Sequence, residues 1–474
     1  PQVPYAITEG RVADHLVPEL EWHDYTSTFY QGVYRQPPGH KETVSPSGLD
    51  VAEYWRPQPG PDLDSRSDDD YRQGFLEVFT EAVNARLRTP PGAVGSMLSG
   101  GVDSGSVVAV AKEILTGRGD GPLPTFSAVR RRIDGDFDAD CPESSAIYAA
   151  ASMPSIAPTL VHPDTAQDRF EQLVSGFDEP FDGVFAFLTA IYLTAHDRGC
   201  RVLLDGGGGD VVLGEGSYLV RLLRQGHWKL AFAEITAESR HWEEASPVPS
   251  LFRYARAAFI PDVVKTPLRS LRQRSNIRGH LGASLISSEL ADRVGIEERF
   301  RQMRSIFPNR WTPDYAAEYC KTILPNMTAG RERYARIAAA SGMEARDPFM
   351  DKRVIEFCSK LPGRLRFSEG WPKMILREAM AETLPHEVLW TRRKPHIGWL
   401  FSEAVTWAAA NRGELNISIL EEALADYVDT EALRAAWQGF RDGGDAERIH
   451  YAHMLAIWLQ KTATRPVVKD WTNR

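Results

Sequence analysis

The chain has little cysteine and no long apolar run. No two cysteines have the C-x-x-C spacing of a zinc site, and the four lie far apart, as Cys141, Cys200, Cys320 and Cys358. So sparse a set favours a reducing compartment, and we expect a cytoplasmic protein. No stretch approaches the roughly 18 apolar residues of a membrane span, and no secretory signal precedes the first turns. We therefore expect no membrane partner.

The chain also lacks an excess of positive charge. The sequence holds 55 Lys and Arg against 64 Asp and Glu, a formal net charge of −9. Proteins that bind nucleic acid through its phosphates need an excess of positive charge, so we expect no nucleic-acid partner. An initiator Met is missing too, and we expect a chain that starts partway into a longer product. With 474 residues, 43% of them hydrophobic, the chain is long enough for several compact units.

Short apolar runs alternate with helical patterns through the first half of the chain. Residues 93–98, 125–129 and 202–204 have the pattern of buried strands, and helices are expected at 71–88, 107–115 and 144–151. This alternation predicts a parallel α/β sheet. From about residue 215 the pattern is mostly helical. Residues 1–60 are turn-rich and too few for a core of their own, so we expect them to pack on another part of the molecule.

A glycine-rich turn joins the first of these strands to a helix. Its sequence is SGGVDS, from Ser99 to Ser104. Backbone N–H groups at a helix N-terminus attract anions, and glycines let the backbone approach phosphate oxygens closely. Asp103 would repel a phosphate unless Mg²⁺ lay between them. The turn therefore predicts a phosphate site with a metal, and the alternative is a plain strand-to-helix turn.

Another glycine-rich turn follows the strand at 202–204. Four glycines at 206–209 lead to Asp210. Ligands bind at the carboxyl ends of strands in open α/β sheets, and glycines there let a ligand lie against the backbone. Asp210 is therefore predicted as the second carboxylate for the metal. The alternative is a flexible loop with an exposed aspartate.

These segments resemble a known family. The SGGVDS string resembles the pyrophosphate loop of the N-type ATP pyrophosphatases. The segments 206–210 (GGGGD), 344–351 (EARDPFMD) and 373–377 (KMILR) resemble those of the asparagine synthetases, β-lactam synthetases and lasso-peptide cyclases. The resemblance implies an ATP-dependent synthetase domain at 61–474, with a parallel sheet and a large helical elaboration. It also implies that residues 1–60 are the remnant of a glutaminase-like β domain.

The resemblance also implies a set of site residues. It implies that ATP and Mg²⁺ are bound, the metal by Asp103 and Asp210. The nucleotide-binding positions that it implies are Leu98, Ser99, Gly100, Gly101, Asp103, Ser104, Val129, Gly206 and Gly207. Val129 is included because the family's second strand contacts adenine through its backbone.

Two catalytic residues come from the same resemblance. Glu344 would face the adenylate as a general base or amine anchor, with a buried salt bridge as the alternative. Lys394, assisted by Arg393, would neutralise charge on the α-phosphate and the leaving pyrophosphate, with a solvated basic loop as the alternative. Arg346 and Asp351 are expected to form a partly buried ion pair.

Two departures from the family narrow the expected reaction. Relatives commonly carry Glu or Tyr where this chain has Gly207, and in β-lactam synthetases that Tyr helps to deprotonate the amine. Asparagine synthetases hydrolyse glutamine with an N-terminal Cys, and here the first residue is Pro1. We therefore expect a lasso-peptide cyclase type of enzyme, which adenylates a side-chain carboxylate of a peptide and closes a macrolactam ring with its α-amine.

Three alternatives stay open. The chain could be an asparagine synthetase without its glutaminase half, a β-lactam-synthetase-like enzyme, or an ATP-binding pseudoenzyme that serves as a scaffold. The expected partner is a peptide or small carboxylate substrate. Whether a leader peptidase or a precursor-recognition protein takes part is also open.

Overall fold

The computed structural model describes most of the chain. The described residues are 6–20, 24–58, 66–129, 142–167, 169–170, 174, 177–181, 186–214, 217–260, 276–306, 323–392 and 398–464. Within them no helix is both long and apolar enough to cross a bilayer.

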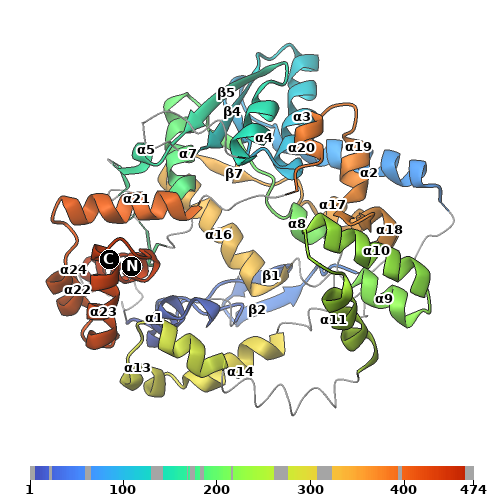
Figure 1. The fold of residues 1–474 in the computed structure, drawn as a ribbon. Coiled ribbons are helices and arrows are strands. Elements are labelled where there is room, and N and C mark those ends of the chain that lie inside the picture. The colour runs from blue at the N-terminus through green and yellow to red at the C-terminus, as the bar shows by residue number, and fades with distance from the viewer. Residues whose placement is uncertain are drawn as a thin grey trace.

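A parallel sheet lies in the upper part of the molecule as Figure 1 shows it. Its strands run in the order β5-β4-β3-β6-β7, and each neighbouring pair is parallel. Their bounds are β3 (Val94–Met97), β4 (Leu123–Ala128), β5 (Ile156–Val161), β6 (Val202–Leu204) and β7 (Glu344–Arg346). The predicted α/β class with a parallel sheet is confirmed, and the three strands expected from sequence lie within a residue or two of their predicted ends.

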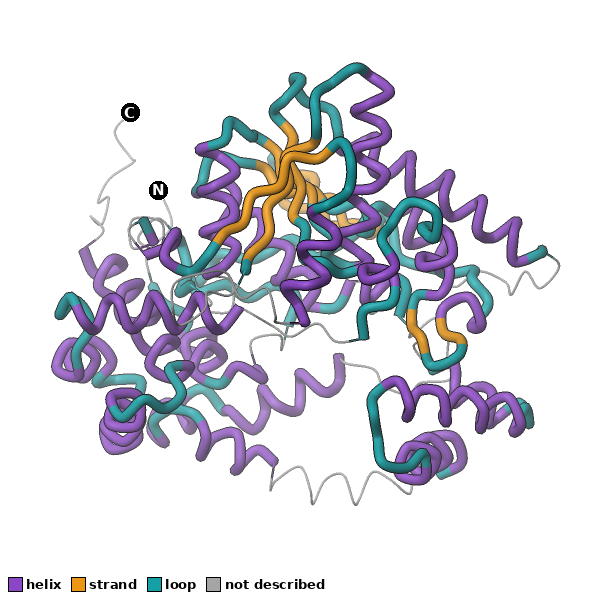
Figure 2. Tube along the Cα trace, turned by 45° about the horizontal axis from the view of Figure 1, so that its top comes forward, coloured by secondary structure: helices purple, strands orange, loops and turns teal. Residues whose placement is uncertain are grey.

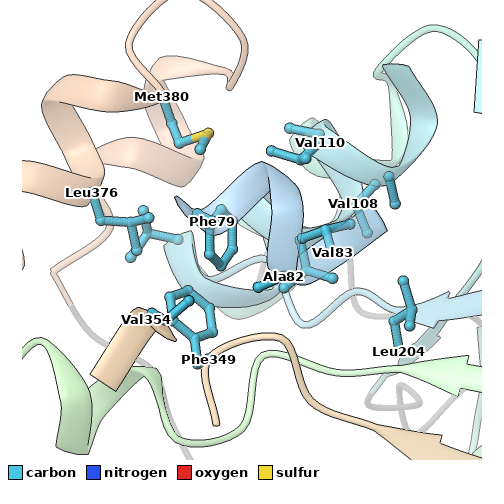
Figure 3. Packing of buried hydrophobic residues seen from close by; sticks show 14 of the residues in the cluster. Phe79, Ala82, Val83, Val108, Val110, Leu204, Phe349, Val354, Leu376 and Met380 are labelled. Atoms are coloured by element: carbon cyan, nitrogen blue, oxygen red, sulfur yellow. The ribbon is translucent and has the colours of Figure 1, made fainter. Parts of the chain in front are cut away.

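One face of the sheet is covered by helices from both halves of the chain. These are α2 (Asp68–Arg86), α3 (Val102–Arg118), α17 (Lys352–Cys358), α18 (Gly363–Arg366), α19 (Met374–Ala379) and α20 (His386–Leu389). Figure 3 shows Phe79 and Val83 of α2 between Leu376 of α19 and Val108 of α3. Burial of these apolar side chains is the main force that joins the late helices to the sheet.

The opposite face packs against a different set of helices. Leu203, next to Leu204 on the same strand, points to this side, as strand alternation requires. Its helices are α5 (Asp164–Gln167), α7 (Ala186–Asp197), α16 (Pro325–Ala340) and α21 (Gly398–Asn411). The sheet is thus buried on both faces, as is usual for parallel strands. Helix α4 (Pro142–Ala151) lies beside α20 at its rim.

A second, all-helical core joins the two ends of the described chain. It contains α1 (Glu9–Leu16), the short helix at Pro18–Leu20, α13 (Ser288–Arg293), α14 (Ile296–Ile306), α22 (Ile417–Leu424), α23 (Thr430–Arg441) and α24 (Glu447–Thr464). Val12, Leu16 and Phe29 share this core with Leu455 and Trp458. The N-terminal segment therefore packs on another part of the molecule, as expected, although the sequence analysis did not foresee α1. The assignment of residues 1–60 to a glutaminase-like remnant stays a prediction.

The remaining elements form a side lobe and two small hairpins. The lobe consists of α9 (Tyr218–Arg224), α10 (Trp228–His241) and α11 (Val248–Phe259), and it has its own small core. The hairpins are β1 (His40–Ser45) with β2 (Gly48–Glu53), and β8 (Phe367–Ser368) with β9 (Trp371–Pro372). In Figure 2 the lobe and the all-helical core lie on opposite sides of the molecule, with the sheet above them.

Candidate active site

The first glycine-rich turn wraps around the hydroxyl of Ser104. That hydroxyl accepts hydrogen bonds from the backbone N–H of Ser99 (3.0 Å) and the Ser99 hydroxyl (2.9 Å), and it donates to the carbonyl of Gly101 (3.2 Å). Gly100 has a φ of 74°, which suits glycine. Helix α3 begins at Val102, earlier than predicted, so Asp103 and Ser104 lie in its first turn. The first N–H groups of a helix lack intrahelical acceptors, so this turn can bind an anion.

The second glycine-rich turn lies directly against the first. A β-carbon at Gly206 would be 2.6 Å from the backbone nitrogen of Ser104, so only glycine allows this approach. A β-carbon at Gly209 would be 2.7 Å from the Asp103 carboxyl carbon. Helix α8 (Gly209–Val212) then places Asp210 in its first turn. The two predicted metal ligands therefore reach the same place from different strands.

Lys373 lies between these two carboxylates. Its ammonium donates to Asp103 Oδ2 (2.5 Å) and pairs with Asp210 Oδ1. Asp103 is buried, whereas the Asp210 side chain is 81% exposed. Burial disfavours the charged form of Lys373, but the two carboxylates outweigh it and raise the pKa of its ammonium. Lys373 also adopts a left-handed backbone (φ 62°) immediately before α19. The site therefore holds a buried positive charge at the point where the sequence predicts a metal.

This arrangement fits Mg²⁺ bound together with a nucleotide. Magnesium sites commonly use one or two carboxylates and complete the shell with phosphates and water. Asp103 and Asp210 both reach the Lys373 ammonium, so both can reach one cation. Across the residues that the structure describes, no group of three or more His, Cys, Asp or Glu side chains forms an all-protein metal cage. Asp103 and Asp210 would hold the ion, which would neutralise phosphate charge.

The predicted adenine contact is restricted by the sheet itself. The N–H of Val129 donates to the carbonyl of Val161 (2.8 Å), and the N–H of Leu98 donates to Phe126 (2.9 Å). The Leu98 carbonyl also accepts the hydroxyl of Ser127 (2.6 Å). A nucleotide base at Val129 would therefore have to use its carbonyl.

The structure does not bring Glu344 to these loops. Glu344 opposes Val202 at the amino end of β7, whereas both glycine turns follow carboxyl ends of strands. Its side chain is 61% exposed and pairs with Arg346 (2.8 Å), which lowers the pKa of the carboxyl. A role as general base stays a prediction without a supporting contact among the described residues.

The prediction that Arg346 and Asp351 pair with each other is wrong, because each pairs with other residues. Arg346 binds Glu344 and also donates to the carbonyls of Arg86 and Arg88 at the end of α2. Asp351 instead pairs with Arg86 (2.7 Å) and Arg353 (2.8 Å) and caps α17. Residues two apart on a strand have their side chains on the same face. The Arg346 guanidinium therefore pairs with Glu344 instead of Asp351.

The predicted catalytic residue Lys394 and its neighbour Arg393 lie outside the described residues, within 393–397. Their predicted roles therefore stay predictions.

Among the described residues, Arg377 is a buried cation of α19. It lies over the rings of Trp371 and Trp390 and donates to the Pro372 carbonyl (2.8 Å). Burial lowers the pKa of this guanidinium to about 10. Arg377 thus fixes the position of Pro372, the residue immediately before Lys373.

Sequence reasoning missed a second buried polar group at the same edge. Arg331 of α16 lies between Asp205, which follows β6, and Asp347, which follows β7. Asp205 immediately precedes the segment 206–210 and Asp347 lies within the segment 344–351, so their positions after strands were a usable signal. Arg331 comes from a helix without any motif, and only the tertiary fold brings it here.

Comparison with known proteins gives a consistent result. The family model "Asparagine synthase" matches residues 74–461. The chain is 25% identical over 412 residues to amidase chyE of Penicillium rubens, 22% over 378 residues to asparagine synthetase [glutamine-hydrolyzing] 3 of Bacillus subtilis, and 24% over 450 residues to asparagine synthetase [glutamine-hydrolyzing] 1 of that bacterium. These matches cover 80%, 77% and 87% of this chain but only 60%, 54% and 64% of those proteins.

Proposed function

The chain belongs to the asparagine synthase family, and from that premise we propose that it is an ATP-dependent ligase that joins a carboxylate to an amine. A carboxylate oxygen attacks the α-phosphorus of ATP, the bond to the β-phosphate oxygen breaks, and pyrophosphate leaves. The amine nitrogen then attacks the acyl carbon of this acyl adenylate. The bond from the acyl carbon to the oxygen on phosphorus breaks, AMP leaves with that oxygen, and the nitrogen loses a proton. A carboxylate alone is a poor electrophile, which is why activation is needed.

This proposal rests on one observation: the carboxylates of Asp103 and Asp210 both pair with the Lys373 ammonium beside the N-terminus of α3. The first turn of α3 presents N–H groups that can bind phosphate oxygens. Mg²⁺ would supply charge neutralisation on the phosphates. Lys373 lies beside the same two carboxylates and can add positive charge next to the phosphates, which lowers the barrier because negative charge grows on the leaving pyrophosphate in the transition state.

For the substrate we propose a peptide, with the ring closed as a macrolactam in the manner of a lasso-peptide cyclase. The side lobe supports this choice because it exposes large apolar side chains: Trp228, Phe232, Trp242 and Phe252 are each more than half exposed. A cleft of about 360 Å³ between the lobe and the hairpin β8–β9 is lined by His241, Trp371 and Arg392, among others. Holding both reacting groups of one peptide makes the second step effectively unimolecular.

The alternative is amide formation on a small acid such as aspartate. Two of the relatives named above are called asparagine synthetases, and this favours it. A β-lactam-synthetase-like enzyme and an ATP-binding pseudoenzyme are the other candidates. The last of these is disfavoured because a scaffold has no need of the Asp103–Lys373–Asp210 arrangement.

ATP–pyrophosphate exchange distinguishes these candidates. The chain is assayed with Mg²⁺ and either aspartate or candidate precursor peptides, with Asp103→Asn as the control. Exchange that needs a peptide and disappears in the variant supports the cyclase proposal, and exchange with free aspartate favours an asparagine synthetase. Exchange that persists in the variant contradicts the proposed site.

A further inference from the structure

A buried polar cluster lies directly behind the second glycine turn. We call it the Asp205 cluster, and its members are Asp205, Arg331, Asp347 and Tyr192. Arg331 Nη1 lies 3.6 Å from Asp205 Oδ1, and its other terminal nitrogen pairs with Asp347. The Tyr192 ring is fully buried, and its hydroxyl interacts electrostatically with Asp205. Two carboxylates face one guanidinium, so with both ionised the cluster carries one excess negative charge.

Three acceptor atoms of this cluster have no hydrogen-bond donor among the described residues. They are Asp205 Oδ2, Asp347 Oδ1 and the Tyr192 hydroxyl oxygen. Only 4% of the Asp205 side chain and 13% of the Asp347 side chain are exposed. Buried polar atoms are nearly always paired, so three unpaired ones on side chains that interact with the same guanidinium point to a missing partner.

The cluster adjoins the proposed reaction site. A β-carbon at Gly207 would lie 2.6 Å from Arg331 Nη1, and the Gly207 N–H donates to Asp205 Oδ1 (2.6 Å). The next residue toward the N-terminus, Gly206, touches the backbone of Ser104. One turn of backbone therefore separates the cluster from the phosphate loop.

We propose that the Asp205 cluster binds the primary amine of the substrate as an ammonium group, which passes one proton to a carboxylate of the cluster before its nitrogen attacks the acyl carbon; this inference rests on the proposed function. An ammonium group carries three N–H donors, and the cluster offers three unpaired acceptors and an excess negative charge. Asp347 and Asp205 neutralise the cation, and Tyr192 accepts the third hydrogen. Arg331 is the most exposed member, at 20% of its side chain.

The electrostatics of Asp205 agree with this assignment. Burial raises the pKa of its carboxyl more than Arg331 and the Gly207 N–H lower it. The existing partners therefore do not compensate for the burial of this carboxylate. A bound ammonium would supply the missing positive charge.

The test uses methylammonium chloride as the probe, because it presents a primary ammonium and little else. The melting temperature of the chain is measured against methylammonium concentration, with sodium chloride at matched ionic strength as the reference. We expect saturable stabilisation of the unsubstituted chain, with an apparent dissociation constant at least tenfold higher in Asp347→Asn and in Tyr192→Phe. Tyr192→Phe keeps every charge and the ring, so it remains informative if Asp347→Asn does not fold.

Asp197→Asn serves as the matched control, because Asp197 forms an exposed ion pair with Arg169. This variant should bind the probe like the unsubstituted chain. The proposal is overturned if methylammonium stabilises no more than sodium, or if Tyr192→Phe and Asp347→Asn bind it normally. Because no ATP is present, this result is independent of the exchange assay, and failure of the proposed function would appear only in that assay.

Discussion

Two regions of the molecule bury ionisable side chains in opposite ways. At the carboxyl edge of the sheet, Asp103 and Lys373 are both buried and paired with each other. In the all-helical core, His15, His450 and His453 are buried, and burial lowers their pKa values to about 4, 3 and 4. The first region therefore holds a buried ion pair, and the second keeps these three histidines neutral at pH 7, although Arg11 and Asp14 on α1 form a buried ion pair there too.

The contacts of each region explain this difference. The His15 Nε2–H donates to the Tyr451 carbonyl (3.0 Å), and His450 Nδ1 lies 2.6 Å from the hydroxyl of Thr406, which itself donates to Ser402. Neutral imidazoles satisfy such partners and avoid the cost of a buried charge. Buried ion pairs rarely stabilise a fold more than apolar side chains would. Buried charge at the sheet edge, where Asp103 and Asp210 follow two glycine turns from different strands, is a sign of function, and the neutral histidines of the helical core are a sign of packing.

Removing a carboxylate from the sheet edge should have the largest effect. We expect Asp103→Asn to lower ATP–pyrophosphate exchange about 1000-fold, because a neutral amide holds a cation poorly and the charge on the phosphates is no longer balanced. Asp197→Asn, at an exposed ion pair, is the control and should keep full exchange. A loss below tenfold for Asp103→Asn would place the nucleotide elsewhere.

Removing the cation between the carboxylates should cost stability. We expect Lys373→Met to lower the free energy of unfolding by about 3 kcal/mol, because Asp103 would stay buried without its partner. Added Mg²⁺ should restore part of this loss, since it can bind both carboxylates. Urea denaturation with and without Mg²⁺ measures both effects, and the exposed Lys360→Met is the control. A variant as stable as the original would show that the pair contributes little.

The helical core should respond to pH instead. Since the folded pKa values lie below the ordinary 6.5, the unfolded chain binds protons between pH 6.5 and 4 that the folded chain does not, so stability falls as the pH falls. At pH 5 we expect His450 alone to account for about 2 kcal/mol of this loss. His450→Leu should flatten the denaturation profile between pH 7 and 5, and the exposed His227→Leu should not. Equal slopes in both variants would assign the pH response to other groups.

The smallest effect should come from the exposed pair on β7. Glu344 is exposed and paired with Arg346, so we expect Glu344→Gln to change the rate of amide formation less than threefold and stability by less than about 0.5 kcal/mol. Steady-state kinetics with the preferred acid substrate would detect a larger role. A hundredfold loss would restore Glu344 as a catalytic residue and contradict the geometry described above.

The sequence was most informative where chemistry and local structure coincide. The glycine turns follow short apolar strands, so Asp103 and Asp210 could be placed at one edge of a parallel sheet before the fold was known. The position of Glu344 at the amino end of β7 could not be predicted, because a motif gives no strand register, and its catalytic role stays a prediction. Arg331 and Tyr192 could not be predicted, because helices α16 and α7 bring them to the site through long-range packing.

Asp103 and Asp210 together form the proposed metal–nucleotide site. The most direct test is Mn²⁺ binding followed by electron paramagnetic resonance, with and without the non-reacting analogue α,β-methylene-ATP. We predict that the analogue makes Mn²⁺ binding much tighter, and that this gain is lost in both Asp103→Asn and Asp210→Asn. Nucleotide-dependent Mn²⁺ binding that survives in both variants would contradict the account.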